Sequence, residues 1–143
     1  VLRVLVTTLK MGQICRADGL ILIWDYADPL VSQVRSRKYA LHWHTAEQPM
    51  WNNGLCYLGA EHQKLYMRVS GGELSTCYGE REPLLGWRST CYGKKQPSYV
   101  LRAQADVKGA IEFVSRIATE PALLEIDIED ELQHFRDMIF KIE

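Results

Sequence analysis

The sequence predicts a mainly β protein, an antiparallel β-sandwich that allows one short helix at its C-terminal end. Short runs of alternating apolar and polar residues follow one another along the chain, and turn signals separate them. Helical periodicity is scarce before residue 120. With 143 residues, 47% hydrophobic and 24% charged, the chain has the size and composition of one globular domain, residues 1–143.

The predicted strands of the N-terminal half begin with residues 2–9, which are rich in Val, Leu and Thr. Asp18-Gly19 separates residues 13–17 from residues 20–25, and this dipeptide favours a tight hairpin because it tolerates positive φ. In residues 34–45 the alternation is clear. Tyr39, Leu41 and Trp43 share one face, which we expect to point inward.

Three more inward faces follow, each bounded by glycine-containing turns. The turns are Gly71-Gly72 and Lys108-Gly109. The apolar faces are Leu65, Met67 and Val69, then Tyr99, Leu101 and Ala103, then Ile111, Phe113, Ser115 and Ile117. These faces are typical of strands with one side in a core.

The C-terminal tail permits two structures. Residues 123–128 can form a strand, and residues 135–142 can be drawn as another. However, an apolar stripe spaced 4, 3, 4 and 3 favours an amphipathic helix with Asp130 near its start. The stripe consists of Ile128, Leu132, Phe135, Ile139 and Ile142.

Four cysteines include no Cys-x-x-Cys pair, so a zinc knuckle is not indicated. Cys77 and Cys91 both lie in the sequence Ser-Thr-Cys-Tyr-Gly. They could form a disulfide if the two copies were antiparallel neighbours. Two buried thiols are the favoured alternative, since free cysteine is commonly buried.

The charge balance excludes some partners. Seventeen basic and 18 acidic residues leave a net charge of −1, which provides no general attraction for nucleic acid. No apolar run approaches the roughly 20 residues that a membrane-spanning helix needs. We therefore expect no nucleic-acid or membrane partner. Because the chain begins at Val1, we expect it to be part of a longer protein.

Two basic clusters and several aromatic residues indicate a surface for an anionic polysaccharide. Guanidinium and ammonium groups suit carboxylate or sulfate, and aromatic rings stack on sugars. We expect Trp43 and Trp87 in the core, whereas Trp51 beside the Asn52-Asn53-Gly54 turn should be exposed. The candidate binding residues are Arg35, Arg37, Lys38, Trp51, Arg88, Tyr92, Lys94 and Lys95.

His42 and His44 are two residues apart on a predicted strand, so their imidazoles share a face and are weak candidates for a metal site. Two ligands are too few for a closed zinc site. Two exposed histidines are the plainer interpretation, and a small metal-dependent enzyme is a third functional hypothesis. Neither a Gly-x-Ser-x-Gly elbow nor a phosphate-binding glycine loop occurs.

Three segments resemble a known family in the order in which that family carries them. Residues 86–97 have the pattern Gly-Trp-x-Ser-x-x-Tyr-Gly-x-Lys-x-Pro. Residues 20–25 form a hydrophobic strand ending in Asp25, and residues 41–45 are rich in His and aromatic side chains. Over roughly residues 1–120 the chain thereby resembles the C-terminal β-domain of heparinase II/III-like polysaccharide lyases.

This resemblance implies an enzyme that cleaves uronic-acid glycans by β-elimination, with most catalytic residues on a helical domain N-terminal to the β-domain. The family places a catalytic histidine in a His-x-His-x-Asp context, but residues 42–45 lack the Asp. The resemblance also implies that the full-length enzyme can hold a zinc ion, with ligands from segments that precede this one and from a strand that opens with a His-Arg-Arg-like sequence. The best match to that opening here is Leu2-Arg3, without a histidine, so zinc is not supported. We therefore assign no catalytic residue, metal or other cofactor to this chain, and expect it to be inactive alone.

The resemblance also implies that the domain supports a missing N-terminal helical catalytic domain, in a periplasmic or secreted enzyme. Members of the family end in strands, so the resemblance implies a C-terminal strand in this chain. That expectation conflicts with the helical stripe. The alternative function is a free-standing carbohydrate- or partner-binding β-sandwich. An exposed apolar patch would favour the first hypothesis, and an aromatic-basic groove would favour the second.

Overall fold

A computed structural model describes residues 7–29, 36–52, 55–59 and 64–140. These residues form antiparallel β-sheets and a short C-terminal helix, which confirms the predicted fold class. The strands are β1 (Thr7–Cys15), β2 (Ile21–Pro29), β3 (Arg37–Thr45), β4 (Met50–Asn52), β5 (Leu55–Leu58), β6 (Leu65–Ser70), β7 (Glu73–Tyr78), β8 (Trp87–Cys91), β9 (Lys94–Pro97), β10 (Tyr99–Val107) and β11 (Ile111–Ala118). The helices are the 3₁₀ turns η1 (Pro121–Glu125) and η2 (Met138–Phe140) and the α-helix α1 (Glu129–Asp137).

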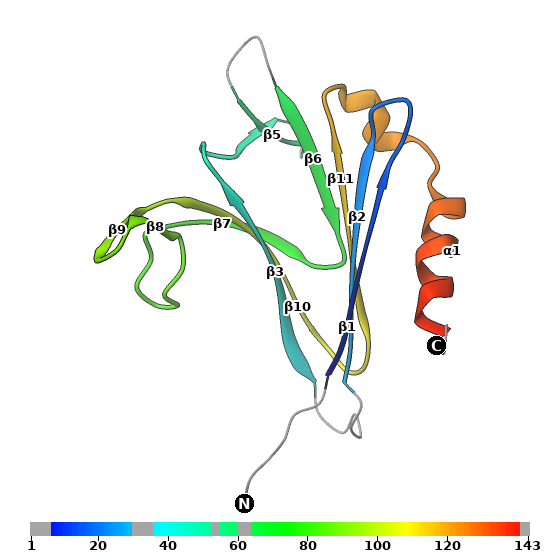
Figure 1. Ribbon diagram of the computed structural model, residues 1–143, viewed down its shortest axis with the longest axis horizontal. Coiled ribbons are helices and arrows are strands. Elements are labelled where there is room, and N and C mark those ends of the chain that lie inside the picture. Colours follow the sequence, from blue (N-terminus) through cyan, green and yellow to red (C-terminus); the bar gives the residue numbers. More distant parts are fainter. Residues whose placement is uncertain (1–6, 30–35, 53–54, 60–63, 141–143) are drawn as a thin grey trace, which may run out of the picture.

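The strands form two facing sheets and a separate hairpin. The large sheet has the order β1-β2-β11-β6-β5-β4, and the small sheet has the order β3-β10-β7. Figure 1 shows the small sheet on one side of the large sheet and α1 on the other. The β8–β9 hairpin extends away from both sheets at the end of β7. The molecule is therefore a β-sandwich with a helix packed on its outer face.

The first core lies between the two sheets, where the alternation predicted it. Tyr39, Leu41 and Trp43 point into it from the small sheet, as expected. The buried members of this core are Ala27, Cys56, Met67, Val69, Leu101, Ala103, Ile111, Phe113 and Ile117. Trp43 Nε1 donates a hydrogen bond to the Oγ atom of the fully buried Ser115 at 3.0 Å, so this polar residue is satisfied.

The second core lies between the large sheet and α1. The ring of Phe135 stacks on Trp24, with centroids 5.6 Å apart and planes inclined by 3°. Gly12 on the neighbouring strand makes this approach possible, since a Cβ atom there would lie 2.5 Å from Phe135 Cδ1. The helix thus packs directly against the backbone of β1 and the indole of β2.

An ion pair closes the edge of this second core. Glu112 on β11 accepts hydrogen bonds from Trp24 Nε1 at 2.7 Å and from Arg136 Nε and Nη2 at 3.1 and 2.8 Å. Burial alone would raise the pKa of Glu112, but the hydrogen bonds from Arg136 and Trp24 outweigh burial and hold the pKa below its ordinary value. The carboxylate therefore ties α1 to two strands of the large sheet.

At the C-terminus the helical stripe predicts the structure correctly and the strand alternatives are wrong. Leu132 and Phe135 are buried on the face of α1 that covers the sheet, and Ile128, the N-cap residue of α1, is buried beside them. Ile142 lies outside the described residues. Instead of a strand, the segment 121–125 forms η1, because Pro121 favours the start of a helical turn. Asp127, and not Asp130, supports the helix start by accepting from the Glu129 backbone N–H at 3.0 Å.

Three smaller expectations are corrected. Cys77 and Cys91 form no disulfide, because β7 pairs with β10 while β8 pairs with β9; Cys91 is also exposed, so only Cys77 is a buried thiol. Leu65 is 37% exposed, although Met67 and Val69 on the same face are buried. Trp87 is half-buried in the β8–β9 region and belongs to neither core cluster.

Candidate functional site

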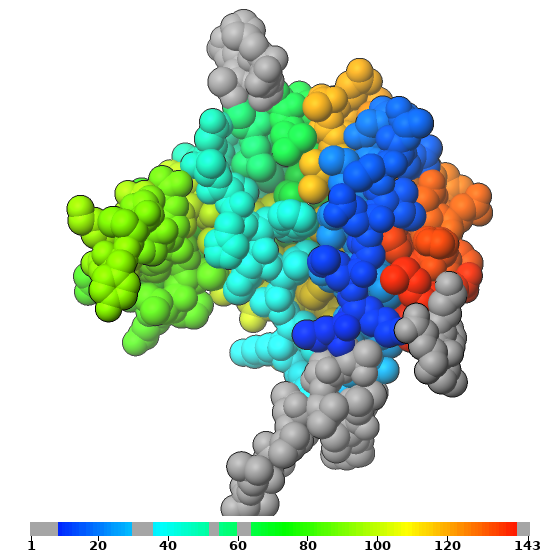
Figure 2. All heavy atoms as spheres, in the orientation of Figure 1, coloured from blue at the N-terminus to red at the C-terminus, as the bar shows by residue number. Residues whose placement is uncertain are grey.

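The predicted basic and aromatic residues of the 86–97 motif all lie on the β8–β9 hairpin. Tyr92 and Lys94 are exposed at its tip. The Gln96 amide, oriented with its oxygen toward Arg88, accepts hydrogen bonds from Arg88 Nε and Nη2 at 2.9 and 3.0 Å. The hairpin therefore presents cations and one tyrosine on a projection from the sandwich. Figure 2 shows this projection as the light-green lobe.

Trp87 anchors this hairpin. Its Nε1 atom donates to the Glu80 carbonyl at 2.9 Å, and Lys95 Nζ lies 4.6 Å from the centroid of its ring. The cation–π contact engages the Lys95 ammonium and covers a face of the indole. Trp87 therefore acts as a support for the hairpin, and Lys94 and Tyr92 are its more accessible side chains.

The other predicted binding residues do not gather in one place. Arg35 lies outside the described residues. Arg37 and Lys38 are neighbours on β3 and point to opposite faces of the small sheet; Arg37 is half-buried on the inner side and Lys38 is exposed. Trp51 is 44% exposed on β4, the edge strand of the large sheet, as predicted.

His42 and His44 both lie exposed on the outer face of the small sheet, as the alternation requires. The pKa of His42 is lowered by partial burial of its ring, by the neighbouring Arg102 on β10 and by His44, and all three favour the neutral imidazole. Within the described residues no third His, Cys, Asp or Glu joins them in a group that could hold a metal ion. A metal at this pair stays an untested hypothesis.

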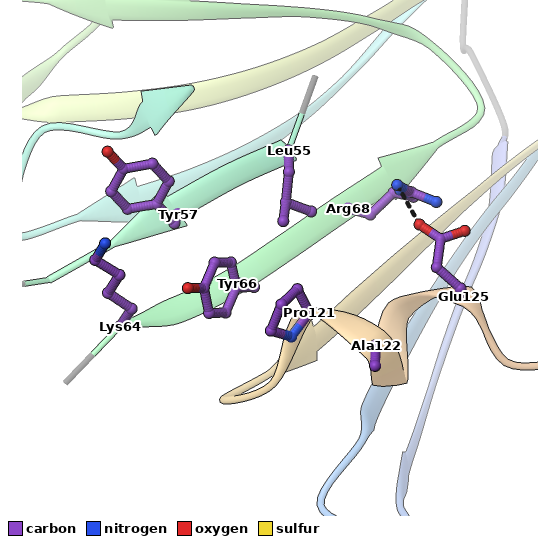
Figure 3. Close-up of a pocket in the computed structure, with 8 residues that line it drawn as sticks. All are labelled: Leu55, Tyr57, Lys64, Tyr66, Arg68, Pro121, Ala122 and Glu125. Atoms are coloured by element: carbon purple, nitrogen blue, oxygen red, sulfur yellow. Dashed lines mark ion pairs between the residues drawn. The ribbon is translucent and has the colours of Figure 1, made fainter. Parts of the chain in front are cut away.

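A site that the sequence reasoning missed lies on the outer face of the large sheet, where β5, β6 and η1 meet. It is a pocket of about 480 Å³, which we call the tyrosine pocket. Its lining residues are Leu55, Tyr57, Lys64, Tyr66, Arg68, Pro121, Ala122 and Glu125 (Figure 3).

Strand register brings the two tyrosines together. Tyr57 on β5 is the direct partner of Tyr66 on β6, and their rings lie 6.2 Å apart with an interplanar angle of 49°. Alternation places Cys56 and Met67 in the first core, so the adjacent tyrosines face outward. Pro121 and Ala122 of η1 form the opposite wall (Figure 3). The result is an open, aromatic-lined hollow.

The pocket carries a cation at each end. Lys64 Nζ lies 4.8 Å from the centroid of the Tyr57 ring, on the side to which both tyrosine hydroxyl groups point (Figure 3). At the other end, Arg68 Nη2 lies 2.6 Å from Glu125 Oε1. This ion pair is exposed, so it contributes only about 0–1 kcal/mol to stability, but it orients the guanidinium beside the pocket. Among the described residues no carboxylate lies within 4 Å of Lys64 Nζ. This ammonium group is therefore available to bind an anion.

The chemistry that these groups support is binding. Tyrosine rings offer apolar faces with hydroxyl groups at one end, and the ammonium of Lys64 offers three hydrogen-bond donors to a carboxylate. A cyclic ligand that carries both hydroxyl groups and an anionic group matches this set. Carboxylated sugars have this combination.

Comparisons with known proteins give no assignment, since no family model, no curated protein and no solved structure matches the chain. The described part of the chain contains no helix that is long and apolar enough to cross a membrane. Any functional assignment therefore depends on the residues of the candidate site and on the family resemblance of the sequence.

Proposed function

We propose that the chain is the C-terminal β-sandwich domain of a heparinase II/III-like polysaccharide lyase, and that it binds the uronic-acid glycan through the tyrosine pocket. The β-elimination belongs to the helical domain of the longer enzyme. The domain itself holds substrate and carries no catalytic residue.

The observation that carries this proposal is the pairing of Tyr57 and Tyr66 between two cations, Lys64 and Arg68. A uronic-acid residue needs an aromatic surface for its ring and a cation for its carboxylate. The pocket supplies both the aromatic surface and the cation, from residues that lie close together on and beside β5 and β6. By contrast, the β8–β9 hairpin supplies cations and Tyr92 without an enclosing wall, so it suits a secondary contact with a long anionic chain.

The free-standing binding module remains the alternative function, and the same pocket supports it. The two hypotheses differ in the length of the gene product. A reading frame that encodes several hundred upstream residues with helical periodicity supports the lyase domain, and a frame that encodes the β-sandwich alone supports the independent module.

Calorimetric titration with alginate and heparin oligosaccharides tests the proposed binding. The 143-residue chain should bind at low salt, and affinity should fall as salt rises because exposed charge pairs are screened over about 10 Å at 0.1 M. Tyr57→Ala should weaken binding by at least about tenfold, or about 1.4 kcal/mol, through lost stacking. Lys64→Gln should weaken it by about fivefold, or about 1 kcal/mol, as for other exposed charge pairs.

Lys95→Gln is the matched control, because it removes the same charge from an exposed lysine that also lies over an aromatic ring. It should change affinity less than Lys64→Gln does. Absence of wild-type binding at low salt, or equal losses for the two lysine variants, would contradict the proposed site. In the same samples the absorbance of unsaturated uronate should not increase, since the chain alone lacks the catalytic residues.

A further inference from the structure

A second hollow lies on the open side of the sandwich, between β3 and the inner face of β1 and β2. We call it the edge groove; its volume is about 280 Å³. In Figure 2 its two borders face the viewer, β3 in cyan and β1 in blue. The groove is lined mainly by apolar residues: Leu9, Lys10, Met11, Asp25, Tyr26, Ala27, Tyr39, Ala40, Leu41 and Phe113. The Lys10 ammonium does not serve the groove, because it donates to the Met138 carbonyl at 2.6 Å.

The apolar border on β1 is left uncovered by the small sheet. Leu9 and Met11 pair with Ala27 and Asp25 of β2, so they point to the same side as the first core. Even so, their exposed fractions are 75% and 68%, whereas Ala27 is buried. The large sheet thus extends one strand beyond the cover that the small sheet gives it.

Asp25 lines this groove, in register between Met11 and Phe113. Its Oδ2 atom is buried and has no hydrogen-bond partner among the residues that the structure describes. Burial raises the pKa of this carboxyl group. A carboxylate oxygen that is buried without a partner is destabilising, so a basic group that enters the groove would form an ion pair with this half-buried carboxylate and relieve that cost.

The backbone at the border is also unpaired. Within the described residues β3 pairs only with β10, and β1 pairs only with β2. β3 is nine residues long, so its outer edge presents N–H and C=O groups along the groove. Such an edge is a template for an additional strand.

We propose that the edge groove binds an extended segment of a different protein, which adds to β3 as a fourth strand of the small sheet. Its inward side chains cover Leu9 and Met11, and one inward lysine or arginine pairs with Asp25. A uronic-acid glycan does not suit this groove, because its carboxylates would meet Asp25 and its hydroxyl groups would meet apolar walls. The proposal is therefore independent of the tyrosine pocket, which lies on the opposite face of the large sheet.

The role of Asp25 can be tested within the chain. Met11 is the register partner of Asp25, with Cβ atoms about 5 Å apart for such pairs, so Met11→Lys places an ammonium group where the partner's basic side chain would lie. This variant should raise Tm by about 3 °C, whereas Leu84→Lys, an equally exposed position in a turn, should leave it unchanged. A Tm for Met11→Lys no higher than that of Leu84→Lys would overturn the role of Asp25.

Binding is tested with a nine-residue peptide that alternates valine and threonine and has lysine at the central inward position. Its control carries norleucine instead. In a two-dimensional amide NMR titration of the 143-residue chain, the lysine peptide should shift signals of β3 and β1 and bind at least tenfold more tightly than the control. Met11→Lys should abolish that difference, because its own lysine already occupies Asp25.

Three results of the titration would overturn the proposal. They are no shifts at millimolar peptide, shifts confined to another face, or equal affinities of the two peptides for the wild-type chain. A concentration-dependent dimer that protects the β3 amides without peptide would also overturn it, since the occupant would then be a second copy of this chain. None of these results affects glycan binding at the tyrosine pocket.

Discussion

Glu112 is the residue that connects helix and sheet through polar contacts, because it accepts hydrogen bonds from both Trp24 and Arg136. Its side chain is 25% exposed and that of Arg136 is 40% exposed, so solvent screens part of the attraction. The sequence did not predict this triad. Three residues from β2, β11 and α1 meet only because the strands pair and the helix folds back over them.

Glu112→Gln should lower the free energy of unfolding by about 1 kcal/mol at pH 7, which is the value of a charge-assisted hydrogen bond reduced for partial exposure. The pKa of Glu112 is depressed in the folded chain, so its contribution is present above the pKa of the unfolded state, about 4.3, and is lost as pH falls through the lower folded pKa. Urea unfolding at pH 7 and pH 3 measures this. A difference between variant and wild type that stays the same at both pH values would contradict the assignment.

At the scale of elements, the sequence predicted faces better than boundaries or partners. The alternation of β3 and β11 and the Asp18-Gly19 hairpin are correct, since each depends on local chemistry. The 3₁₀ turn at η1 was missed because apolar residues near Leu124 are compatible with a strand until packing against the large sheet decides. Likewise, the identical sequences around Cys77 and Cys91 gave no information on their different partners.

The packing of α1 on β1 predicts a non-additive pair of substitutions. Gly12→Ala should destabilise the chain by about 1–3 kcal/mol, because the new methyl group overlaps the Phe135 ring. In a Phe135→Ala background, which itself should cost about 3–5 kcal/mol, Gly12→Ala should cost almost nothing. Chemical denaturation of the four chains completes the cycle. Equal costs of Gly12→Ala in both backgrounds would show that α1 does not contact Gly12.

At the scale of the whole molecule, the residues that the sequence indicated and the pocket that the structure shows lie in different places. Composition and motif pointed to the cations of the β8–β9 hairpin, which the structure places on a projection. The tyrosine pocket was missed because Tyr57 and Tyr66 become neighbours only through the register of β5 and β6. Its wall comes from η1, more than 50 residues further along the chain. Alternation could have indicated Tyr66 and Arg68 as outward side chains opposite Met67 and Val69.

The direct test of the central claim is a two-dimensional NMR titration of the 143-residue chain with an alginate oligosaccharide at low salt. The proposal predicts saturable shifts of the backbone amides of β5, β6 and η1, together with shifts of the ring signals of Tyr57 and Tyr66. Signals of the β8–β9 hairpin should move less. Shifts confined to that hairpin, or no shifts at millimolar oligosaccharide, would contradict the tyrosine pocket as the glycan site.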